Sequence, residues 1–394
     1  MAEVKKNKNY LTNREIRAIA KANAKEIKRL EAYKNRKCEE SEFLSEMKND
    51  ANILEIDDLH TSFFTEQGVV RAVNGVSYDV PKNAVVGIVG ESGCGKSVTS
   101  MSVMRLIQGP TGQIVSGSIR FKSQETVKNE QGELETVDKV YDIAKMPIQE
   151  IHRIRGKQIA MIFQEPMTSL NPVFTIGQQL DEVTLIHVPG ATKELAKEKS
   201  CEMLRLVGII PENVYDAFPH ELSGGMRQRV MIAMALAAEP RLIIADEPTT
   251  ALDVTIQAQI LDLLQDIKNK IDGSILLITH DLGVIAEMAD YVVVMYAGKV
   301  IEKGTVMEIF KDPKHPYTIG LQKSKPTLGL DDGEELYNIP GNVPNPINMP
   351  NHCYFKERCA KCVNKCSGEY PGMVQLSPTH FVACHLYQEV ENND

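Results

Sequence analysis

From Ile53 onward, short runs of apolar residues alternate with longer stretches whose apolar positions follow a helical period. Runs that are apolar at almost every position are typical of parallel strands, because helices cover both faces of a parallel sheet. The pattern predicts an α/β domain over residues 51–305. The predicted strands span residues 84–90, 158–163, 242–246, 274–279 and 291–296.

The first fifty residues have a different character. Thirteen Lys and Arg residues outnumber nine Asp and Glu residues here, although the whole chain has a net charge of −9. Ile16, Ile19, Ala20, Ile27 and Leu30 fall near one face of a predicted helix that is otherwise rich in basic residues. This extension is expected to be either a solvated helix or a basic amphipathic helix that contacts lipid headgroups or a partner protein.

Two further segments depart from the α/β pattern. Residues 121–141 are polar and rich in Glu, Lys and Gln, which predicts a peripheral surface insertion. Residues 306–350 end in a proline-rich stretch and are predicted to form a linker. We expect this linker to separate the cysteine-rich tail, residues 351–390, from the residues that carry out the chemistry.

Composition narrows the class of protein. The chain has 394 residues, of which 43% are hydrophobic and 25% are charged, as in an average folded soluble protein. Its apolar runs are shorter than the roughly 20 residues of a membrane-spanning helix, and its acidic balance argues against bulk nucleic-acid binding. The N-terminus does not resemble a secretory signal, so the eight cysteines are expected in a reducing compartment. Clustered cysteines there indicate metal binding or catalysis rather than disulfides.

The strongest chemical signal is a glycine-rich loop that fits the pattern G-x-x-x-x-G-K-[ST]. It lies between the strand predicted at 84–90 and a helical stretch at 98–106, which is the context of a phosphate-binding loop. Backbone N–H groups and the helix N-terminus would face the phosphates, Lys96 would reach the β- and γ-phosphates, and Ser97 would bind Mg²⁺. Cys94 is interpreted as a small side chain rather than a nucleophile. The loop consists of Gly90, Glu91, Ser92, Gly93, Cys94, Gly95, Lys96 and Ser97.

Two other predicted strands end in polar side chains. The strand at 242–246 ends in Asp246 and is followed by Glu247, and His280 follows the strand at 274–279. Ligand sites in parallel sheets form at the carboxyl ends of the strands. Asp246 is therefore expected to complete the Mg²⁺ shell, Glu247 to act as general base on the attacking water, and His280 to sense the γ-phosphate.

Residues 222–228 resemble the signature motif of ABC ATPases. With the phosphate loop, Gln164, Asp253 and His280, they form the family's motif set in the family's order. The resemblance implies that two ATP-binding domains pair head to tail, with each ATP between the phosphate loop of one and the signature motif of the other. It implies that Gln164 contacts the Mg²⁺ and γ-phosphate site and links it to a helical subdomain at about 165–235. The signature residues expected at the nucleotide are Ser223, Gly224, Gly225 and Gln228.

The same resemblance implies an aromatic side chain that stacks on adenine. Phe63 is the candidate, and Phe64 and Tyr78 are nearby alternatives. The implied fold is an α/β P-loop ATPase core with an antiparallel β subdomain, a helical subdomain and a cysteine-rich C-terminal extension.

A closer similarity is to the ATPases of peptide-type ABC importers. It implies an ATPase at the cytoplasmic face of the membrane that powers uptake of oligopeptides or dipeptides. The implied partners are a paralogous ATPase, two membrane permeases and an extracellular peptide-binding protein. An importer for another solute such as nickel and a soluble ABC ATPase acting on DNA or ribosomes are the alternatives. The similarity rests on residues 163–172, 315–318 and 339–346, on Cys353, Phe355, Arg358 and Cys359, and on residues 382–385.

The tail carries five cysteines, Cys353, Cys359, Cys362, Cys366 and Cys384. Four or five thiols in so short a segment can ligate zinc or an iron–sulfur cluster, and free thiols in a packed tail are the third possibility. The family resemblance implies a [4Fe–4S] cluster held by Cys353, Cys359, Cys366 and Cys384. Cys362 is additional to that pattern. Such a cluster could also make the tail a redox or iron sensor.

Overall fold

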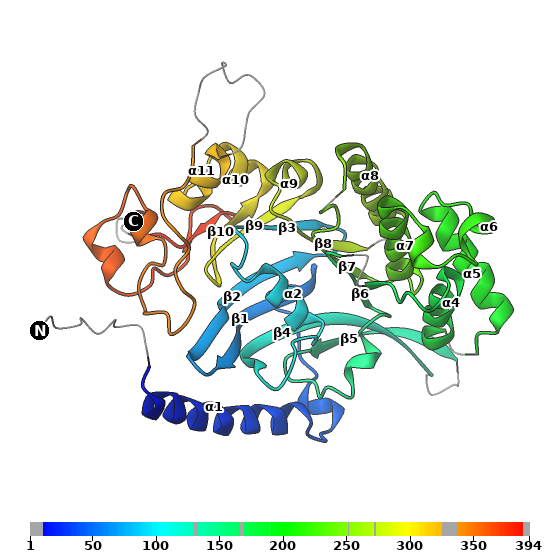
Figure 1. Cartoon of the computed structure of the whole chain (residues 1–394), viewed down its shortest axis with the longest axis horizontal. Coiled ribbons are helices and arrows are strands. Elements are labelled where there is room, and N and C mark those ends of the chain that lie inside the picture. Colours follow the sequence, from blue (N-terminus) through cyan, green and yellow to red (C-terminus); the bar gives the residue numbers. More distant parts are fainter. Residues whose placement is uncertain are drawn as a thin grey trace, which may run out of the picture.

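Two β-sheets form the centre of the molecule, and helices pack around them (Figure 1). The computed structural model describes residues 11–128, 133–165, 169–188, 190–250, 252–271, 273–324 and 337–388. Parts of several predicted segments therefore lie outside the described residues: 1–10 of the extension, 129–132 of the insertion, 166–168 of the importer-like segment, 325–336 of the linker, and 389–390 of the tail.

The larger sheet contains the strands that the apolar runs predict. The five strands from β9 to β6 are parallel, and β10 pairs with β9 in the antiparallel sense. All residues of β3, β6, β7 and β8 are buried, which explains why the sequence shows near-continuous apolar runs. The strand order is β11 (Val374–Gln375), β12 (Phe381–Val382), β10 (Lys299–Thr305), β9 (Tyr291–Tyr296), β3 (Val85–Val89), β8 (Ser274–Ile278), β7 (Leu242–Asp246) and β6 (Ile159–Ile162).

The smaller sheet is antiparallel and corrects one expectation. It has the order β2 (Gly68–Pro81), β1 (Asn52–Thr65), β4 (Gly112–Lys128) and β5 (Leu134–Asp142). Residues 121–141, predicted to be a peripheral insertion, form most of the β4–β5 pair. Phe121 and Tyr141 face each other in register, and neither is exposed to solvent. The prediction was wrong at the two ends of the segment, where Phe121, Ser123 and Tyr141 are buried, whereas the other described positions are half-buried or exposed. Alternate residues of a strand face opposite sides, so the polar outward positions concealed these buried ones.

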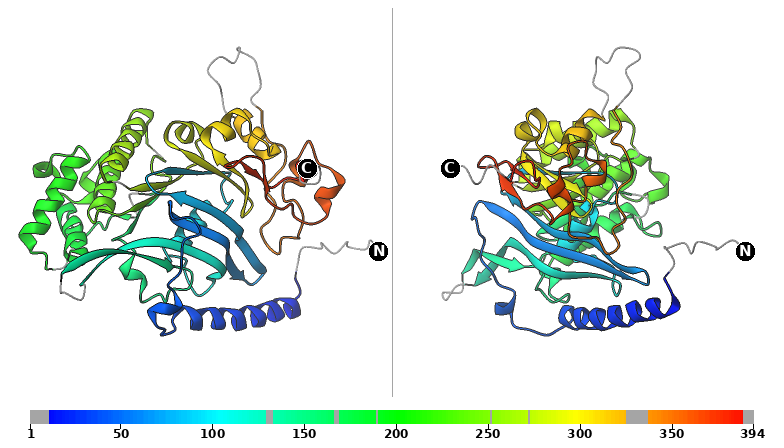
Figure 2. Two further views of the ribbon diagram at one scale, coloured as in Figure 1. Left: turned by 180° about the vertical axis from the view of Figure 1, so that it is seen from behind. Right: turned by 90° about the vertical axis from the view of Figure 1, so that its left-hand side faces the viewer.

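A helical lobe follows β6 and lies beside the larger sheet (Figures 1 and 2). It contains α4 (Ile176–His187), α5 (Lys193–Leu206), α6 (Pro211–Val214), η3 (Pro219–Glu221) and α7 (Gly224–Leu236). The remaining helices are α1 (Asn13–Lys34), α2 (Lys96–Val103), α8 (Val254–Ile271), α9 (Leu282–Met288), α10 (Val306–Lys311) and α11 (Pro316–Lys323), with single turns η1 (Glu40–Glu42), η2 (Ile151–Arg153), η4 (Lys356–Arg358) and η5 (Asn364–Ser367). Among the described residues, no helix combines the length and apolarity needed to cross a bilayer.

The N-terminal helix α1 packs along the smaller sheet (Figure 1). Its apolar face contributes the buried Leu30, and Asn23 Nδ2 donates to the carbonyl oxygen of Thr65 at 2.9 Å. Thr12 and Glu15 form a capping box at the start of the helix, which satisfies its first free N–H groups. The predicted apolar face is thus covered only in part: Ile16, Ile19 and Ile27 are half-buried and Ala20 is exposed, like most of the lysines and arginines of the helix.

The segment predicted to be a linker packs against the preceding α/β domain along much of its described length. α10 and α11 cover β9 and β10, and the side chain of Tyr317 in α11 is fully buried. Ile339 and Met349 in the proline-rich stretch are also buried. Farther on, β12 pairs with β10, so the tail adds two short strands to the larger sheet.

Candidate active site

The glycine-rich loop lies between β3 and α2 (Figure 1). Gly93 and Gly95 have φ values of 78° and 102°, in the left-handed region that glycine adopts readily. A side-chain carbon at Gly93 would meet nothing within 4 Å, so a phosphate group can approach the backbone N–H groups from that side. Lys96 is 6% exposed, and its Nζ donates to the carbonyl oxygens of Gly90 at 2.7 Å and Glu91 at 3.2 Å. The lysine ammonium group is thus held within the loop.

Ser97 and Asp246 join this loop to the end of β7. Ser97 Oγ donates to Asp246 Oδ1 at 3.0 Å. Burial raises the pKa of Asp246; Ser97 and Lys96 oppose the rise, and the nearby Glu247 adds to it. A hydroxyl group beside a carboxylate supplies hard oxygen donors of the kind that Mg²⁺ prefers. These two residues therefore fit the predicted Mg²⁺ site.

Three side chains, those of Gln164, Thr250 and His280, contact the carboxylate of Glu247. Its carboxylate accepts hydrogen bonds from Gln164 Nε2 at 2.9 Å and Thr250 Oγ1 at 2.8 Å, and it lies 3.3 Å from His280 Nδ1. Its backbone has a φ of 48°, and its N–H donates to the carbonyl oxygen of Ile278 at the end of β8. The structure thus brings the side chains of Gln164, Glu247 and His280 together. Thr250 was not predicted, although its position three residues after Glu247 is the local signal that could have indicated it.

The signature residues lie at the start of α7 in the helical lobe (Figure 1). Ser223 is the N-cap residue, and its Oγ accepts from the N–H of Met226 at 3.3 Å. Gln228 is 1% exposed, and its Nε2 donates to the carbonyl oxygen of Pro248 at 2.5 Å. Gln228 therefore connects the signature helix to the turn after Glu247 rather than facing open solvent. Ser223, Gly224 and Gly225 form the N-terminal end that can face an anion.

Asp253 and the aromatic candidates have contrasting surroundings. Asp253 is exposed, and its Oδ1 accepts from the N–H of Ile256 at the start of α8. Phe64 and Tyr78 are buried in the core, whereas Phe63 on β1 is half-buried. Of the three aromatic rings, Phe63 is thus the one with surface left for an adenine ring.

Cys94 agrees with its interpretation as a small packed side chain. It is 1% exposed, and burial raises the pKa of its thiol. A thiol that stays protonated is a poor nucleophile.

The tail cysteines are residues of the kind that bind metals, but their side chains are not arranged around a common point in the described residues. Cys353, Cys366 and Cys384 are buried, Cys359 is half-buried and Cys362 is exposed. Burial raises the pKa of Cys353 to about 12, and the neighbouring Cys366, Cys384 and Cys359 add to the rise. Cysteine thiolates are the usual ligands of zinc and of iron–sulfur clusters, so the residue types fit such a centre. In the described parts of the chain, however, no group of three or more Cys, His, Asp or Glu side chains is placed to hold a metal ion.

The prediction that the linker separates the tail from the residues that carry out the chemistry does not hold for the glycine-rich loop. Arg358, in the turn η4 of the tail, donates to both carboxylate oxygens of Glu91 in the glycine-rich loop, at 2.7 and 3.0 Å. The prediction failed because the proline-rich stretch folds against the core and brings the tail back to the loop, 267 residues away in sequence. Nothing in the local pattern around Arg358 indicates such a distant contact.

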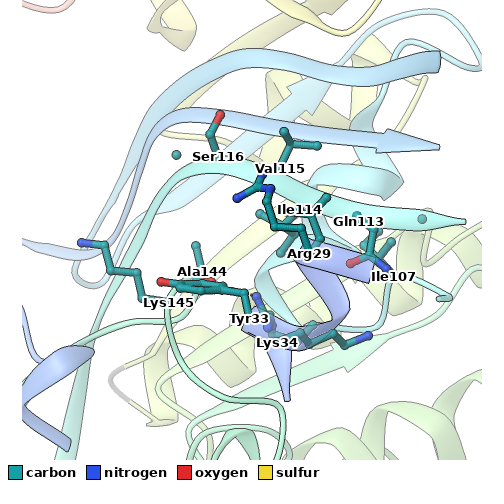
Figure 3. A pocket seen from close by; sticks show the side chains of 14 residues that line it. Arg29, Tyr33, Lys34, Ile107, Gln113, Ile114, Val115, Ser116, Ala144 and Lys145 are labelled. Atoms are coloured by element: carbon teal, nitrogen blue, oxygen red, sulfur yellow. Dashed lines mark hydrogen bonds between the residues drawn. The ribbon is translucent and has the colours of Figure 1, made fainter. Parts of the chain in front are cut away.

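A cavity of about 200 Å³ lies between α1 and β4 (Figure 3). Arg29, Tyr33 and Lys34 form its α1 side, and Gln113 and Ile114 lie on the β4 side. It shares no lining residue with the glycine-rich loop, so it is separate from the site described above.

The chain is similar to known ATP-binding proteins of peptide transporters. Residues 73–250 match the ABC transporter family, and residues 301–366 match the oligopeptide/dipeptide transporter C-terminal region. The oligopeptide transport ATP-binding protein OppD of Bacillus subtilis is 50% identical over 335 residues, covering 85% of this chain and 88% of OppD. The dipeptide transport ATP-binding protein DppD of the same organism is 47% identical, covering 86% of this chain and 95% of DppD.

Solved structures share the fold at lower identity. The dimeric, ADP- and phosphate-bound ATP-binding cassette MJ0796 is 23% identical, with a TM-score of 0.53 over 64% of this chain and 98% of that chain. The cbiO1 protein from Clostridium perfringens is 24% identical, with a TM-score of 0.52 over 69% of this chain and 96% of that chain. These likenesses confirm the P-loop ABC ATPase fold.

Proposed function

Because the chain belongs to the ATP-binding subunits of oligopeptide and dipeptide ABC transporters, we propose that it hydrolyses ATP to drive peptide uptake across the cytoplasmic membrane. It is an ABC ATPase. The similarity of residues 301–366 to the peptide-transporter C-terminal region favours peptides over nickel or another solute, and favours transport over a soluble ATPase acting on DNA or ribosomes. The observation that carries the chemistry is the convergence of Gln164, Thr250 and His280 on Glu247, beside the loop that holds Lys96.

This arrangement supports a role for each of the site residues. Lys96 and the loop N–H groups would bind the phosphates, and Ser97 and Asp246, with Gln164, would hold Mg²⁺, which would neutralise charge on the phosphates. Glu247 accepts the proton of the attacking water, and His280 orients Glu247 and contacts the γ-phosphate. Phe63 stacks on the adenine ring.

A second ATPase subunit completes the site. The N-terminal end of α7, with Ser223, Gly224 and Gly225, would face the γ-phosphate of ATP bound to a paralogous partner, and Asp253 would lie near the same interface. Gln228 acts in this scheme through Pro248, next to Glu247. Binding of the partner domain at α7 would therefore change the surroundings of Glu247, the proposed general base.

The helical lobe is proposed to dock on a membrane permease at the cytoplasmic face. An apolar groove of about 290 Å³ lies beside Gln164, between β6 and the lobe. Phe163, Leu170 and Met231 line it, and the nearby Val173 and Phe174 expose large parts of their side chains. A short amphipathic helix of a permease would cover this apolar surface and contact the segment that carries Gln164.

We also propose that the tail binds a metal centre, a [4Fe–4S] cluster rather than zinc, through Cys353, Cys359, Cys366 and Cys384. The support is the clustering of these cysteines between residues 353 and 384 and the burial of three of them. Binding would need a local adjustment that closes the thiols around the metal and removes their protons.

Peptide uptake by cells that lack the chromosomal copy of this subunit tests the transport function. Cells supplied with the wild-type chain should accumulate a labelled oligopeptide, and cells supplied with Glu247→Gln should not. Nickel uptake measured in parallel serves as the control for cargo. Peptide uptake that is independent of the subunit, or a nickel defect in its place, would contradict the proposal.

A further inference from the structure

Arg358 is bound on every side within the tail and the core. It is 8% exposed, and its five hydrogen bonds match the five N–H donors of its guanidinium group. Two of them form a fork on the Glu91 carboxylate, and the others reach Pro340, Ile339 and Tyr296. A bidentate pair of this kind fixes direction as well as distance.

Glu91 transmits that constraint to the phosphate-binding lysine. The backbone carbonyl oxygen of Glu91 accepts from Lys96 Nζ at 3.2 Å and from the N–H of Cys94 at 3.2 Å. The backbone N–H of Glu91 donates to the hydroxyl group of Tyr317 at 2.8 Å. The side chain, the N–H and the carbonyl of one loop residue are therefore all held, two of them by segments beyond residue 305.

The tail segment that presents Arg358 is itself rigidly packed. The ring of Phe355 lies 5.3 Å from that of Tyr296 and 5.5 Å from that of Tyr317, measured between centroids. Cys359 directly follows Arg358, and the N–H of Cys353 donates to the carbonyl oxygen of Cys366. The direction of Arg358 thus depends on how the cysteine-rich tail is folded.

We propose that Arg358 is a positioning residue of the phosphate loop, through which an ordered C-terminal tail keeps Glu91 and Lys96 in the arrangement that binds nucleotide. The inference rests on the proposed function, because it takes this loop to be the ATP site. Loss of Arg358, or unfolding of the tail that carries it, releases the loop and weakens nucleotide binding.

The test is the affinity of the full-length chain for a fluorescent ATP analogue with Mg²⁺, measured for Arg358→Met, Glu91→Gln and the double variant. Each single variant should weaken binding on the order of ten-fold, since one charged hydrogen-bonded pair is lost. The double variant should be about as weak as either single one, because both remove the same interaction. Lys361→Met is the matched control, since it removes an exposed tail cation and should leave the affinity unchanged.

Thermal denaturation of each variant separates positioning from a merely structural contact. Unchanged affinity in Arg358→Met, with only a lower melting temperature, would overturn the proposal. Arg358→Lys keeps the charge and most of the packing without the fork, so it should fold and show an intermediate affinity; wild-type affinity in this variant would also overturn the proposal. Lys96→Ala identifies the other failure: if it too binds nucleotide normally, the assignment of the ATP site is wrong.

Discussion

Gln164 and Glu247 are joined by a hydrogen bond of 2.9 Å between the amide nitrogen of Gln164 and Oε2 of the carboxylate. Gln164 follows β6 and leads into the helical lobe, whereas Glu247 follows β7. The bond therefore connects the segment beside the apolar groove directly to the proposed general base. A movement of the lobe can therefore change the surroundings of the Glu247 carboxylate directly, through Gln164 alone.

Glu247→Gln should abolish turnover while preserving nucleotide binding. The new amide oxygen can still accept from Gln164 and Thr250, so the geometry is kept and only the basic carboxylate is lost. We expect kcat for ATP in the assembled transporter to fall by about 100-fold or more. Nucleotide affinity of the full chain should remain close to wild type.

Lys96→Ala provides the contrast to this variant. It removes the ammonium group that the loop carbonyls hold, so it should weaken nucleotide binding itself. Retention of most ATPase activity by Glu247→Gln would refute its role as general base.

Phe63 and Phe64 are adjacent, and their substitutions should have different effects. Phe63→Ala removes a half-buried ring and should weaken ATP binding on the order of ten-fold, since stacking on a base contributes about 1–3 kcal/mol. Phe64→Ala removes a buried ring and should instead lower the free energy of unfolding by about 3 kcal/mol. Nucleotide titration and urea unfolding of both variants check this. The reverse outcome would transfer the adenine contact to Phe64.

Local sequence patterns were sufficient to predict the parallel strands and the residues at their ends. Val85–Val89 and Leu242–Asp246 are buried at every position, so their composition identified them and placed Lys96 and Asp246 at one edge of the sheet. Contacts between distant segments leave no such local pattern. The pair of Arg358 and Glu91 depends on how the chain folds back over 267 residues, and no periodicity encodes it.

Polar composition was misleading where one side of a strand or helix is buried. Tyr141 lies in a segment whose polar residues indicated an insertion, yet its ring is buried and its hydroxyl oxygen lies within hydrogen-bond distance of two carboxylates, 2.9 Å from Glu40 Oε1 and 2.6 Å from Glu125 Oε1. Leu30 lies on a basic helix whose apolar face is covered in part by the smaller sheet. In both elements, the identity of the covering partner decides the outcome, and the local sequence does not specify it.

The metal proposal predicts that substituting a ligand cysteine and substituting Cys362 have different effects on metal content. Anaerobically purified protein should be brown and contain iron and sulfide, because thiolate-bound iron absorbs visible light and zinc does not. Cys359→Ser and Cys366→Ser should lose the metal, and the exposed Cys362→Ser should retain it as the matched control. Metal analysis and absorption spectra provide the measurement. Colourless protein with stoichiometric zinc would contradict the assignment of iron. Metal loss in Cys362→Ser alone would contradict the proposed set of ligands.

His315 should make the stability of the protein depend on pH between about 4 and 6.5. The imidazole is 2% exposed, its Nδ1 accepts from the N–H of Tyr317 at 3.0 Å, and burial lowers its pKa to about 4 from an ordinary value of 6.5, with Glu302 opposing the shift. Within this window the unfolded chain binds a proton that the folded chain does not. The contribution is therefore fully present above pH 6.5 and decreases as the pH falls toward 4, by up to about 3 kcal/mol.

His315→Asn isolates this effect, because an amide oxygen can still accept from the N–H of Tyr317 but does not titrate. Urea unfolding of the full chain at pH 5, 6, 7 and 8 gives the free energy of unfolding for both proteins. The wild-type curve should be steeper than the variant's between pH 5 and 6.5 by about one proton, and the two should run parallel above pH 7. Equal slopes over the whole range would show that His315 is protonated in the folded protein as readily as in the unfolded chain.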